Sequence, residues 1–148
     1  MKFSKKSRYG VAALIDLALH GGGAHVSLGS IAERNQISPQ YLEQVFASLR
    51  RAGIVRSVKG SQGGYLLNRA ASDITVADIV HALEGSYHLE PELQARDGSL
   101  SDISRTIQED VVDRVNDGLD RILKNLTLAE LERDCLDRET EGQDMYYI

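Results

Sequence analysis

The 148-residue sequence contains one cysteine, Cys135, two prolines and no tryptophan. A single thiol forms no internal disulfide and cannot build a metal site alone. The chain also lacks an apolar run long enough to span a membrane, and no apolar secretory segment follows its basic start, MKFSKKSRYG. These absences predict a cytoplasmic protein without a membrane partner, built as one domain with or without an oligomerisation element.

Acidic residues are scarce in the first half of the chain. Residues 1–69 hold ten lysines and arginines against three acidic residues, whereas residues 70–148 hold seven against nineteen. The net charges of the two parts are therefore +7 and −12, within a net charge of −5 for the whole chain. This division favours contact between the first half and a polyanion.

Helical periodicity dominates the first 51 residues. Apolar residues recur at helical spacing from Ser4 to about His20, and a second short helix fits Leu28–Asn35. The third helix has the strongest signals, because Ser38 can cap it and Pro39 suits its first position. The buried stripe of this helix is predicted to consist of Leu42, Val45, Phe46 and Leu49. Arg50 and Arg51 fall in its last turn, and Gly53 ends it.

A glycine-rich turn follows between two short β-prone runs. The segment VKGSQGGYLL, residues 58–67, places Lys59 before three glycines and a β-prone run after them. A mononucleotide-binding loop needs its lysine after the glycines and a helix behind it, so a hairpin is predicted instead. We expect the glycines to supply positive φ where the ribbon reverses.

The second half is predicted to be helical around one loop. Thr75 and Asp78 form a capping-box pattern for a helix to about Glu84, and residues 86–98 show no periodicity. A long helix is expected from Ser101 to Asn125, then a short helix from Thr127 and a mobile acidic tail over 137–148. The long helix carries an apolar stripe made of Ile107, Val111, Val115, Leu119 and Ile122. We expect a second copy of the chain to cover this stripe, and the alternative is that the helix packs on its own domain.

Three helices followed by a hairpin is the element order of a winged helix-turn-helix. The predicted fold class is mainly α with a small β-hairpin wing, plus a long dimerisation helix. The third helix would enter the major groove, where glutamine pairs with adenine and glutamate accepts from cytosine, while the cations, Lys6 among them, face phosphates. The predicted DNA-contacting residues are Lys5, Arg8, Ser38, Gln40, Tyr41, Glu43, Gln44, Ser48, Arg50, Arg51, Arg56, Lys59, Gly60, Gly63 and Gly64.

Three segments within residues 1–85 carry a family resemblance. SRYGVAALIDLALH, SIAERNQISPQYLEQVFASLRRAGIVRSVKGSQGGYLL and ITVADIVHALEG resemble the Rrf family of bacterial winged-helix regulators, of the IscR, NsrR and CymR kind. The resemblance implies a homodimeric transcriptional regulator whose two wings bind a partly palindromic operator in double-stranded DNA. It divides the chain into a DNA-binding domain (1–85), an effector or linker loop (86–100), a dimerisation helix with a short C-terminal helix (101–136) and a tail (137–148).

The cluster-binding members of that family carry three cysteines in the loop before the dimer helix. This sequence has none there, and thiolates are what hold an iron–sulfur cluster, so neither a cofactor nor a metal is expected. A solvated role is expected for the lone His88. The resemblance is therefore greatest to the cluster-less CymR-type repressors of cysteine metabolism.

The end of the chain, MYYI, strengthens that likeness. CymR-like proteins end similarly, and O-acetylserine sulfhydrylase receives partner tails that end in isoleucine. The predicted partner-binding residues are Met145, Tyr146, Tyr147 and Ile148, although the same residues could instead pack on the dimer helix.

Other functions stay open beside DNA binding. The chain could serve mainly as an interaction module for a metabolic enzyme, or as a small-molecule or redox sensor of the same fold. Acidic neighbours of Cys135 argue against a redox switch there. No nucleophile–base pair indicates an enzyme.

Overall fold

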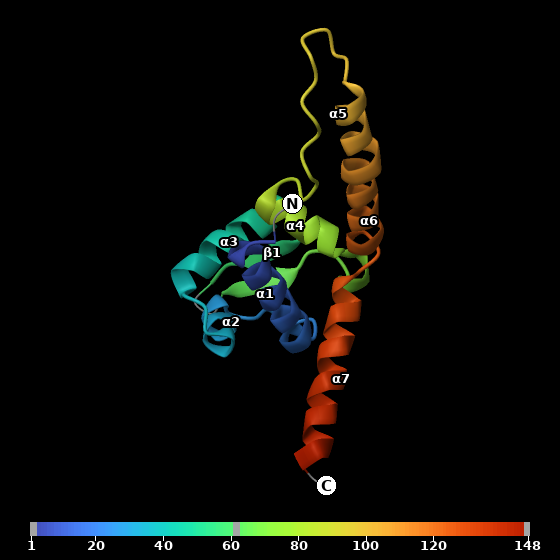
Figure 1. Cartoon of the computed structure of the whole chain (residues 1–148). Coiled ribbons are helices and arrows are strands. Elements are labelled where there is room, and N and C mark those ends of the chain that lie inside the picture. The colour runs from blue at the N-terminus through green and yellow to red at the C-terminus, as the bar shows by residue number, and fades with distance from the viewer. Residues whose placement is uncertain (1–2, 61–62, 147–148) are drawn as a thin grey trace.

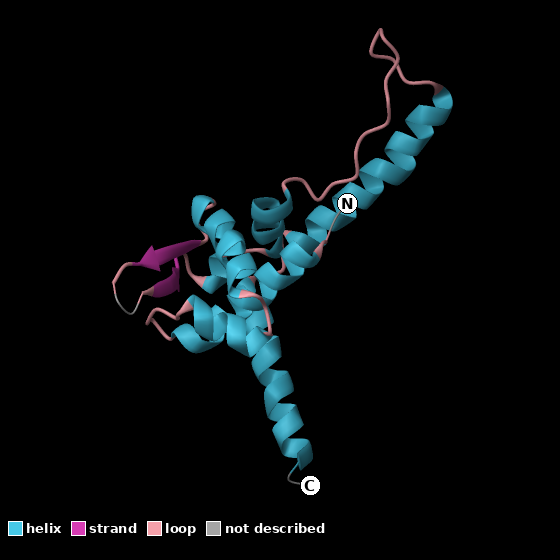
Figure 2. Ribbon diagram, turned by 90° about the vertical axis from the view of Figure 1, so that its left-hand side faces the viewer, coloured by secondary structure: helices cyan, strands magenta, loops and turns pink. Residues whose placement is uncertain are grey.

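The computed structural model of the chain describes residues 3–60 and 63–146. Its first part gathers helices around one core, with an antiparallel hairpin on one side, as Figures 1 and 2 show. In chain order the elements of this part are α1 (Lys5–Gly21), α2 (Leu28–Asn35), α3 (Pro39–Arg51), β1 (Val55–Val58), β2 (Gly64–Leu67), the 3₁₀ turn η1 (Ala71–Asp73) and α4 (Val76–Glu84). The predicted fold class, mainly α with a hairpin wing, is confirmed.

The core forms because each helix turns one apolar stripe inward. Leu14 of α1, Ile31 of α2, Phe46 of α3 and Ile79 of α4 are all fully buried in one cluster. Helix α1 passes close to α4 at Gly10, where a Cβ would lie 2.3 Å from the Cδ1 atom of Leu83, so a larger residue would have to displace the end of that side chain. The core thereby fixes α3 against the other three helices.

The hairpin is joined to the helical core at one further point. Strands β1 and β2 pair antiparallel with Val55 opposite Leu67 and Val58 opposite Gly64. Tyr65 also exchanges two backbone hydrogen bonds with Val26, at 3.0 and 2.9 Å, so the loop before α2 pairs with β2 in an antiparallel bridge. The wing is therefore held by the loop before α2 as well as by its own pairing.

The second part consists of a helical arm and a final long helix. The arm comprises α5 (Asp102–Ile107), the π-helical segment η2 (Gln108–Asp113) and α6 (Arg114–Leu123), and it rises away from the core beside the segment 86–101 (Figure 1). The long helix predicted from Ser101 is thus present, with one π segment that the sequence did not indicate.

Helix α7 corrects two predictions. It runs over Leu128–Tyr146, so the predicted short final helix is wrong, and the expected mobile tail is helical to Tyr146; residues 147 and 148 lie outside the described residues. Thr127 caps it by accepting from the Glu130 N–H at 3.2 Å. Once the first turn is fixed, each added residue gains a backbone hydrogen bond, so the polar sequence continues as helix.

The first turn of α7 is anchored in the N-terminal core. Leu128 is fully buried there, and its N–H donates to the Ile74 carbonyl at 2.8 Å. The Val76 N–H donates to the Leu126 carbonyl, also at 2.8 Å. These hydrogen bonds hold the connection between α6 and α7 against the start of α4, while α5 and η2 extend away from the core. Within the described part of the chain, no helix has the length and apolar character that crossing a bilayer would need.

Candidate nucleic-acid interface

Helix α3 presents one polar face to solvent because its other face is buried. The Ser38 hydroxyl accepts from the Tyr41 N–H at 3.3 Å, Pro39 starts the helix, and Leu42, Val45, Phe46 and Leu49 are fully buried. The predicted cap and stripe of this helix are therefore confirmed. The exposed side chains are those of Gln40, Glu43, Gln44, Arg50 and Arg51.

Two predicted contact residues of α3 behave differently. Ser48 is only 8% exposed, and its hydroxyl donates to the Gln44 carbonyl and accepts from Arg51 at 3.2 Å. Its expected place on the exposed face is wrong, because it lies at the border of the buried stripe and orients Arg51. Tyr41 is half-buried against the Tyr9 ring, with the ring centroids 5.6 Å apart.

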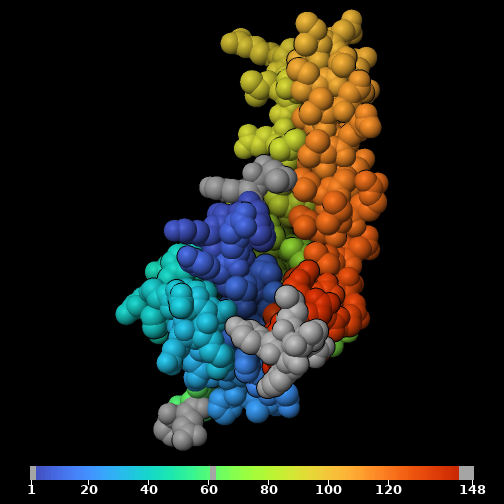
Figure 3. Space-filling model, turned by 60° about the horizontal axis from the view of Figure 1, so that its bottom comes forward, coloured from blue at the N-terminus to red at the C-terminus, as the bar shows by residue number. Residues whose placement is uncertain are grey.

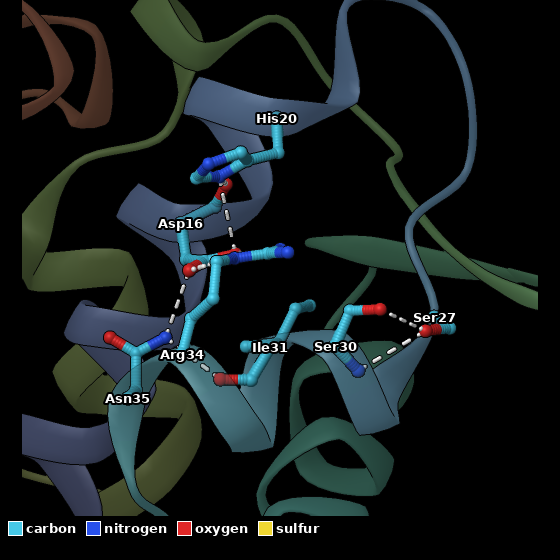
Figure 4. Close-up of polar contacts among 7 residues, drawn as sticks. All are labelled: Asp16, His20, Ser27, Ser30, Ile31, Arg34 and Asn35. Atoms are coloured by element: carbon cyan, nitrogen blue, oxygen red, sulfur yellow. Dashed lines mark hydrogen bonds and ion pairs between the residues drawn. The ribbon is translucent and has the colours of Figure 1, made fainter.

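The angle between α1 and α2 is set by a buried carboxylate. Asp16 of α1 accepts three hydrogen bonds from the Arg34 guanidinium, at 2.6, 2.9 and 3.2 Å, and one from the Asn35 amide at 2.9 Å. His20 lies on the other side of the same group (Figure 4). The hydrogen bond to Asp16 raises the pKa of Arg34 above its ordinary value. This pair holds the first helix of the helix-turn-helix in place, and Asp16 on an otherwise apolar stripe was the sequence signal for it.

The wing glycines have separate physical roles. Gly60 adopts φ of +134°, as expected for the reversal of the ribbon. Gly64 does not have positive φ, and a Cβ at Gly63 or Gly64 would meet the Val58 oxygen at 2.6 Å or the Val26 oxygen at 2.4 Å, respectively. The prediction that all three supply positive φ is therefore wrong, and Gly64 is a buried packing residue. Residues 61 and 62 are outside the described part.

Cations surround the exposed face of α3 from two sides. Arg56 and Lys59 are exposed on the wing, and Lys5 and Arg8 are exposed on the first turn of α1. That turn lies next to the start of α3 through the Tyr9–Tyr41 contact.

The start of α1 is also fastened to α4. The hydroxyls of Ser4 and Ser7 donate to the Glu84 carboxylate, the second at 2.9 Å. The cations of this turn are therefore presented from a fixed backbone.

The basic first part of the sequence and the arm with α7 occupy different sides of the molecule. In the face shown in Figure 3, residues of the N-terminal half, blue to cyan, form one side, and those of the arm and α7, orange to red, form the other. The half with net charge +7 contains α3 and the wing. A basic surface of this kind attracts a polyanion over several ångströms and positions it before specific contacts form.

The arm exposes most of its predicted apolar stripe. Ile103, Val111 and Ile122 are 76%, 50% and 61% exposed, and Ile107 and Val115 are also exposed. Leu119 differs, because it packs against a buried cluster of its own chain that consists of Val76, Ala77, Val80 and Tyr87. The alternative of cover by its own domain thus holds for this one position.

The π segment lies in the middle of that stripe. In an α-helix, residues four apart drift by about 40° around the axis, so the stripe would wind about 160° over four such steps. The wider turns of η2 reverse part of this drift. The stripe is therefore straighter than an unbroken α-helix would make it.

Residues 86–101 form a loop, which confirms the loop predicted over residues 86–98, and side-chain amides hold it to the arm. Asn116 accepts from the Leu89 N–H at 2.8 Å and donates to the Leu89 carbonyl, while Gln108 accepts from the Glu92 N–H at 2.7 Å. His88 is not simply solvated as expected, because its Nε2 lies 2.8 Å from the Asp120 carboxylate.

The residues of this segment do not fit an iron–sulfur cluster. The segment contains no cysteine, and Cys135 lies on α7 in a pocket with His20 and Arg34 of α1 and α2. Within residues 3–60 and 63–146, no group of three or more histidine, cysteine or acidic side chains is arranged to hold a metal ion. The donor set for a cluster is absent from this loop.

Comparison with known proteins agrees with this architecture. A family model described as Rrf2, iron-dependent transcriptional regulator, matches residues 3–134. The regulator IscR of Pectobacterium carotovorum is 40% identical over 134 residues, which cover 88% of this chain and 79% of IscR.

Solved structures give the same picture. CymR, the global cysteine regulator of B. subtilis, superposes with a TM-score of 0.74 at 34% identity, covering 90% of this chain and 97% of CymR. IscR of T. potens superposes with a TM-score of 0.71 at 42% identity, covering 91% and 88%.

Proposed function

The chain belongs to the Rrf2 family of DNA-binding transcriptional regulators, and from that premise we propose that it is a homodimeric repressor that works without an iron–sulfur cluster. The family makes it a regulator and not an enzyme. The observation that carries the proposal is the joint exposure of the polar face of α3 and the wing cations on the basic half of the chain.

DNA recognition would use α3 and the wing together. Gln40 and Gln44 lie on the exposed face of α3 and suit adenine edges in the major groove, and Glu43 suits the amino group of cytosine. Arg50, Arg51, Arg56, Lys59, Lys5 and Arg8 suit phosphates, which supply much of the affinity.

A second copy of the chain would cover the arm. The arm exposes a continuous apolar stripe made of Ile103, Ile107, Val111, Val115 and Ile122, whereas an ordinary surface carries only isolated apolar residues. A parallel or crossed pair of arms would bury this stripe. The straightening by η2 supports this use, because a flat stripe can meet its own symmetry mate along its length.

The absence of a cluster rests on the donor set. Thiolates hold such clusters, and residues 86–101 offer histidine and carboxylates instead. The family description names iron, while CymR is described as a global cysteine regulator. Because the loop lacks the cysteines, we favour the second and propose genes of cysteine or sulfur metabolism as the regulated set.

The wing and the helix can be tested separately. Footprinting on the DNA upstream of the protein's own gene would identify the operator. Titrations of operator DNA at several salt concentrations would then compare the affinities of the variants. Lys59→Ala should weaken binding to all sequences and lower the log–log salt slope by about one unit. Gln40→Ala should relax sequence preference, at a cost of about 1–3 kcal/mol if it contacts a base in bidentate fashion. The control is Arg133→Ala, which removes an exposed cation from α7. Unchanged affinity and slope in Lys59→Ala would remove the wing from the proposal.

A protein partner is the second candidate function, favoured by the likeness to CymR. We propose that residues 145–148 bind an O-acetylserine sulfhydrylase-type enzyme. Deleting Met145–Ile148 should abolish co-elution with that enzyme and leave operator binding intact. Co-elution that survives the deletion would exclude the tail as the binding segment.

A further inference from the structure

Three side chains converge on one carboxylate where the segment after α4 meets the arm. Asp120 of α6 accepts from the Tyr87 hydroxyl, its Oδ1 lies 2.8 Å from the His88 Nε2, and its Oδ2 lies 3.6 Å from the Lys124 Nζ. The hydrogen bonds from Tyr87 and His88 lower the pKa of Asp120, so this carboxylate is ionised. The cluster is thus an arrangement of donors that already recognises an oxyanion.

The same three donors line a pocket. The cavity of about 500 Å³ lies between the first turns of α4, residues 86–88 and the end of α6, and its walls include Tyr87, His88 and Lys124. Thr75, His81 and Ser86 add further polar groups around it. A volume of this size suits a small metabolite.

We propose that this pocket binds a small molecule that carries a carboxylate or phosphate group, with Lys124 and His88 as the anion-binding residues. Lys124 has three N–H donors, and one long contact to Asp120 leaves donors available. The Nε2 nitrogen of His88, which faces Asp120, would donate instead to an external oxyanion that displaces this carboxylate. Both donors are therefore able to serve an external oxyanion.

One acidic side chain of the pocket needs separate consideration. Asp78 also lines it, but its carboxylate accepts from the Thr75 N–H at 3.0 Å and lies 3.8 Å from the Arg69 guanidinium. Asp78 is thereby committed to capping α4 and to a cation. Its charge opposes an incoming anion less than a free carboxylate would.

The ligand would compete with Asp120 for the same donors. Asp120 belongs to α6, whereas Tyr87 and His88 belong to the segment that follows α4. An anion that takes Lys124 and His88 loosens a contact between the arm and the part of the chain that carries α3. The regulatory consequence rests on the proposed DNA-binding function, but the binding itself does not.

The test is a titration of the isotope-labelled full chain, without DNA, followed by nuclear magnetic resonance at constant ionic strength. The probes are inorganic phosphate and succinate, and succinamide is the neutral control. Saturable shifts are expected at the amides of Thr75, Ser86, His88 and Lys124 with at least one of the two anions. The tighter anion identifies the ligand class as phosphate ester or carboxylate.

Three variants make the outcome decisive. Lys124→Ala should weaken binding roughly 10- to 100-fold, as expected for one lost charge-assisted hydrogen bond. Asp120→Asn should tighten it, because the internal competitor loses its charge. Arg121→Ala removes an exposed cation on the same helix and should leave the affinity unchanged. The proposal is overturned if neither anion shifts these amides, if succinamide shifts them equally, or if Lys124→Ala binds as the unaltered chain does.

Discussion

The N-terminal core and the arm differ in the solvent exposure of their apolar side chains. Leu14, Phe46 and Ile79 of the core are fully buried, whereas Ile103, Val111 and Ile122 of the arm lie largely in solvent. The core buries its apolar side chains within one chain, and charged and polar groups occupy its surface. The arm leaves its apolar side chains exposed, which supports the proposed cover by a second copy of the chain.

The two regions also differ in what their polar residues do. In the core, Asp16 and Ser38 hold helices through hydrogen bonds, and Ser48 orients the Arg51 cation. Along the arm, Asn116 and Gln108 hold a loop through its backbone groups. Rigid presentation suits recognition of a fixed duplex, while a loop held by a few amides suits a contact that can change.

The largest effect is expected from breaking the arm alone. The double change Val111→Glu and Val115→Glu places two charges in the exposed stripe and should yield a folded monomer. Because two linked half-site contacts become one, operator affinity should fall by about 10²- to 10⁴-fold. Sedimentation equilibrium and DNA titration measure the two consequences.

The matched control adds charge beside the stripe. Thr106→Glu changes an exposed residue of α5 that is not part of the stripe, and it should leave both mass and affinity unchanged. A double variant that stays dimeric would show that the stripe is not the interface.

Within the core, Gly64→Ala should have the next largest effect. The new Cβ would lie 2.4 Å from the Val26 carbonyl oxygen, so the wing must move away from the loop before α2. Overpacking of this kind costs about 1–3 kcal/mol of unfolding free energy. Denaturant titration measures it.

Gly29→Ala is the control for that change, since a Cβ there meets no atom within 4 Å among the described residues. Its position inside α2 should make alanine stabilising by up to about 1 kcal/mol. Equal stability of the two variants would contradict the assigned role of Gly64.

A smaller loss is expected for Asp16→Asn. Asparagine keeps the size of the side chain but removes the charge that faces Arg34 and His20. Since the Arg34 side chain is about one third exposed, solvent compensates part of the loss, and we expect roughly 1–2 kcal/mol. Thermal unfolding would check this against Glu33→Gln, an exposed neighbour on α2. Equal behaviour of the two variants would mean that the buried carboxylate does not hold α1 to α2.

Local sequence signals predicted much of this structure. Ser38 and Pro39 marked the start of α3, and Thr75 with Asp78 marked α4, where both hydrogen bonds of the capping box form. These features succeed because cap and helix lie within four residues of each other. The exposed face of α3 followed from the same periodicity.

Features that depend on contacts distant in sequence were not predictable. Gly64 is required by the backbone of Val26, and Ser48 is buried by the packing of a neighbouring stripe. The length of α7 follows from its first turn, which Leu128 anchors in the core, and no pattern in the sequence indicates the π turns of η2. Residue type and spacing carry no information on these distances.

The smallest expected effect concerns the contact between the two regions and is a dependence on pH. The pKa of Asp120 lies below its ordinary value of 3.8, because the Tyr87 hydroxyl and then His88 hydrogen-bond to the ionised form. A carboxylate with a lowered folded pKa stabilises the native state above its ordinary pKa, and this contribution is lost as pH falls through the folded value. Asp120→Asn should therefore be less stable than the unaltered chain near neutral pH, and the difference should shrink between about pH 5 and pH 2. Urea unfolding at a series of pH values measures this, with Asp117→Asn as the control for removing one carboxylate from α6. A difference that stays constant down to the acid end would show that Asp120 does not link the segment after α4 to the arm.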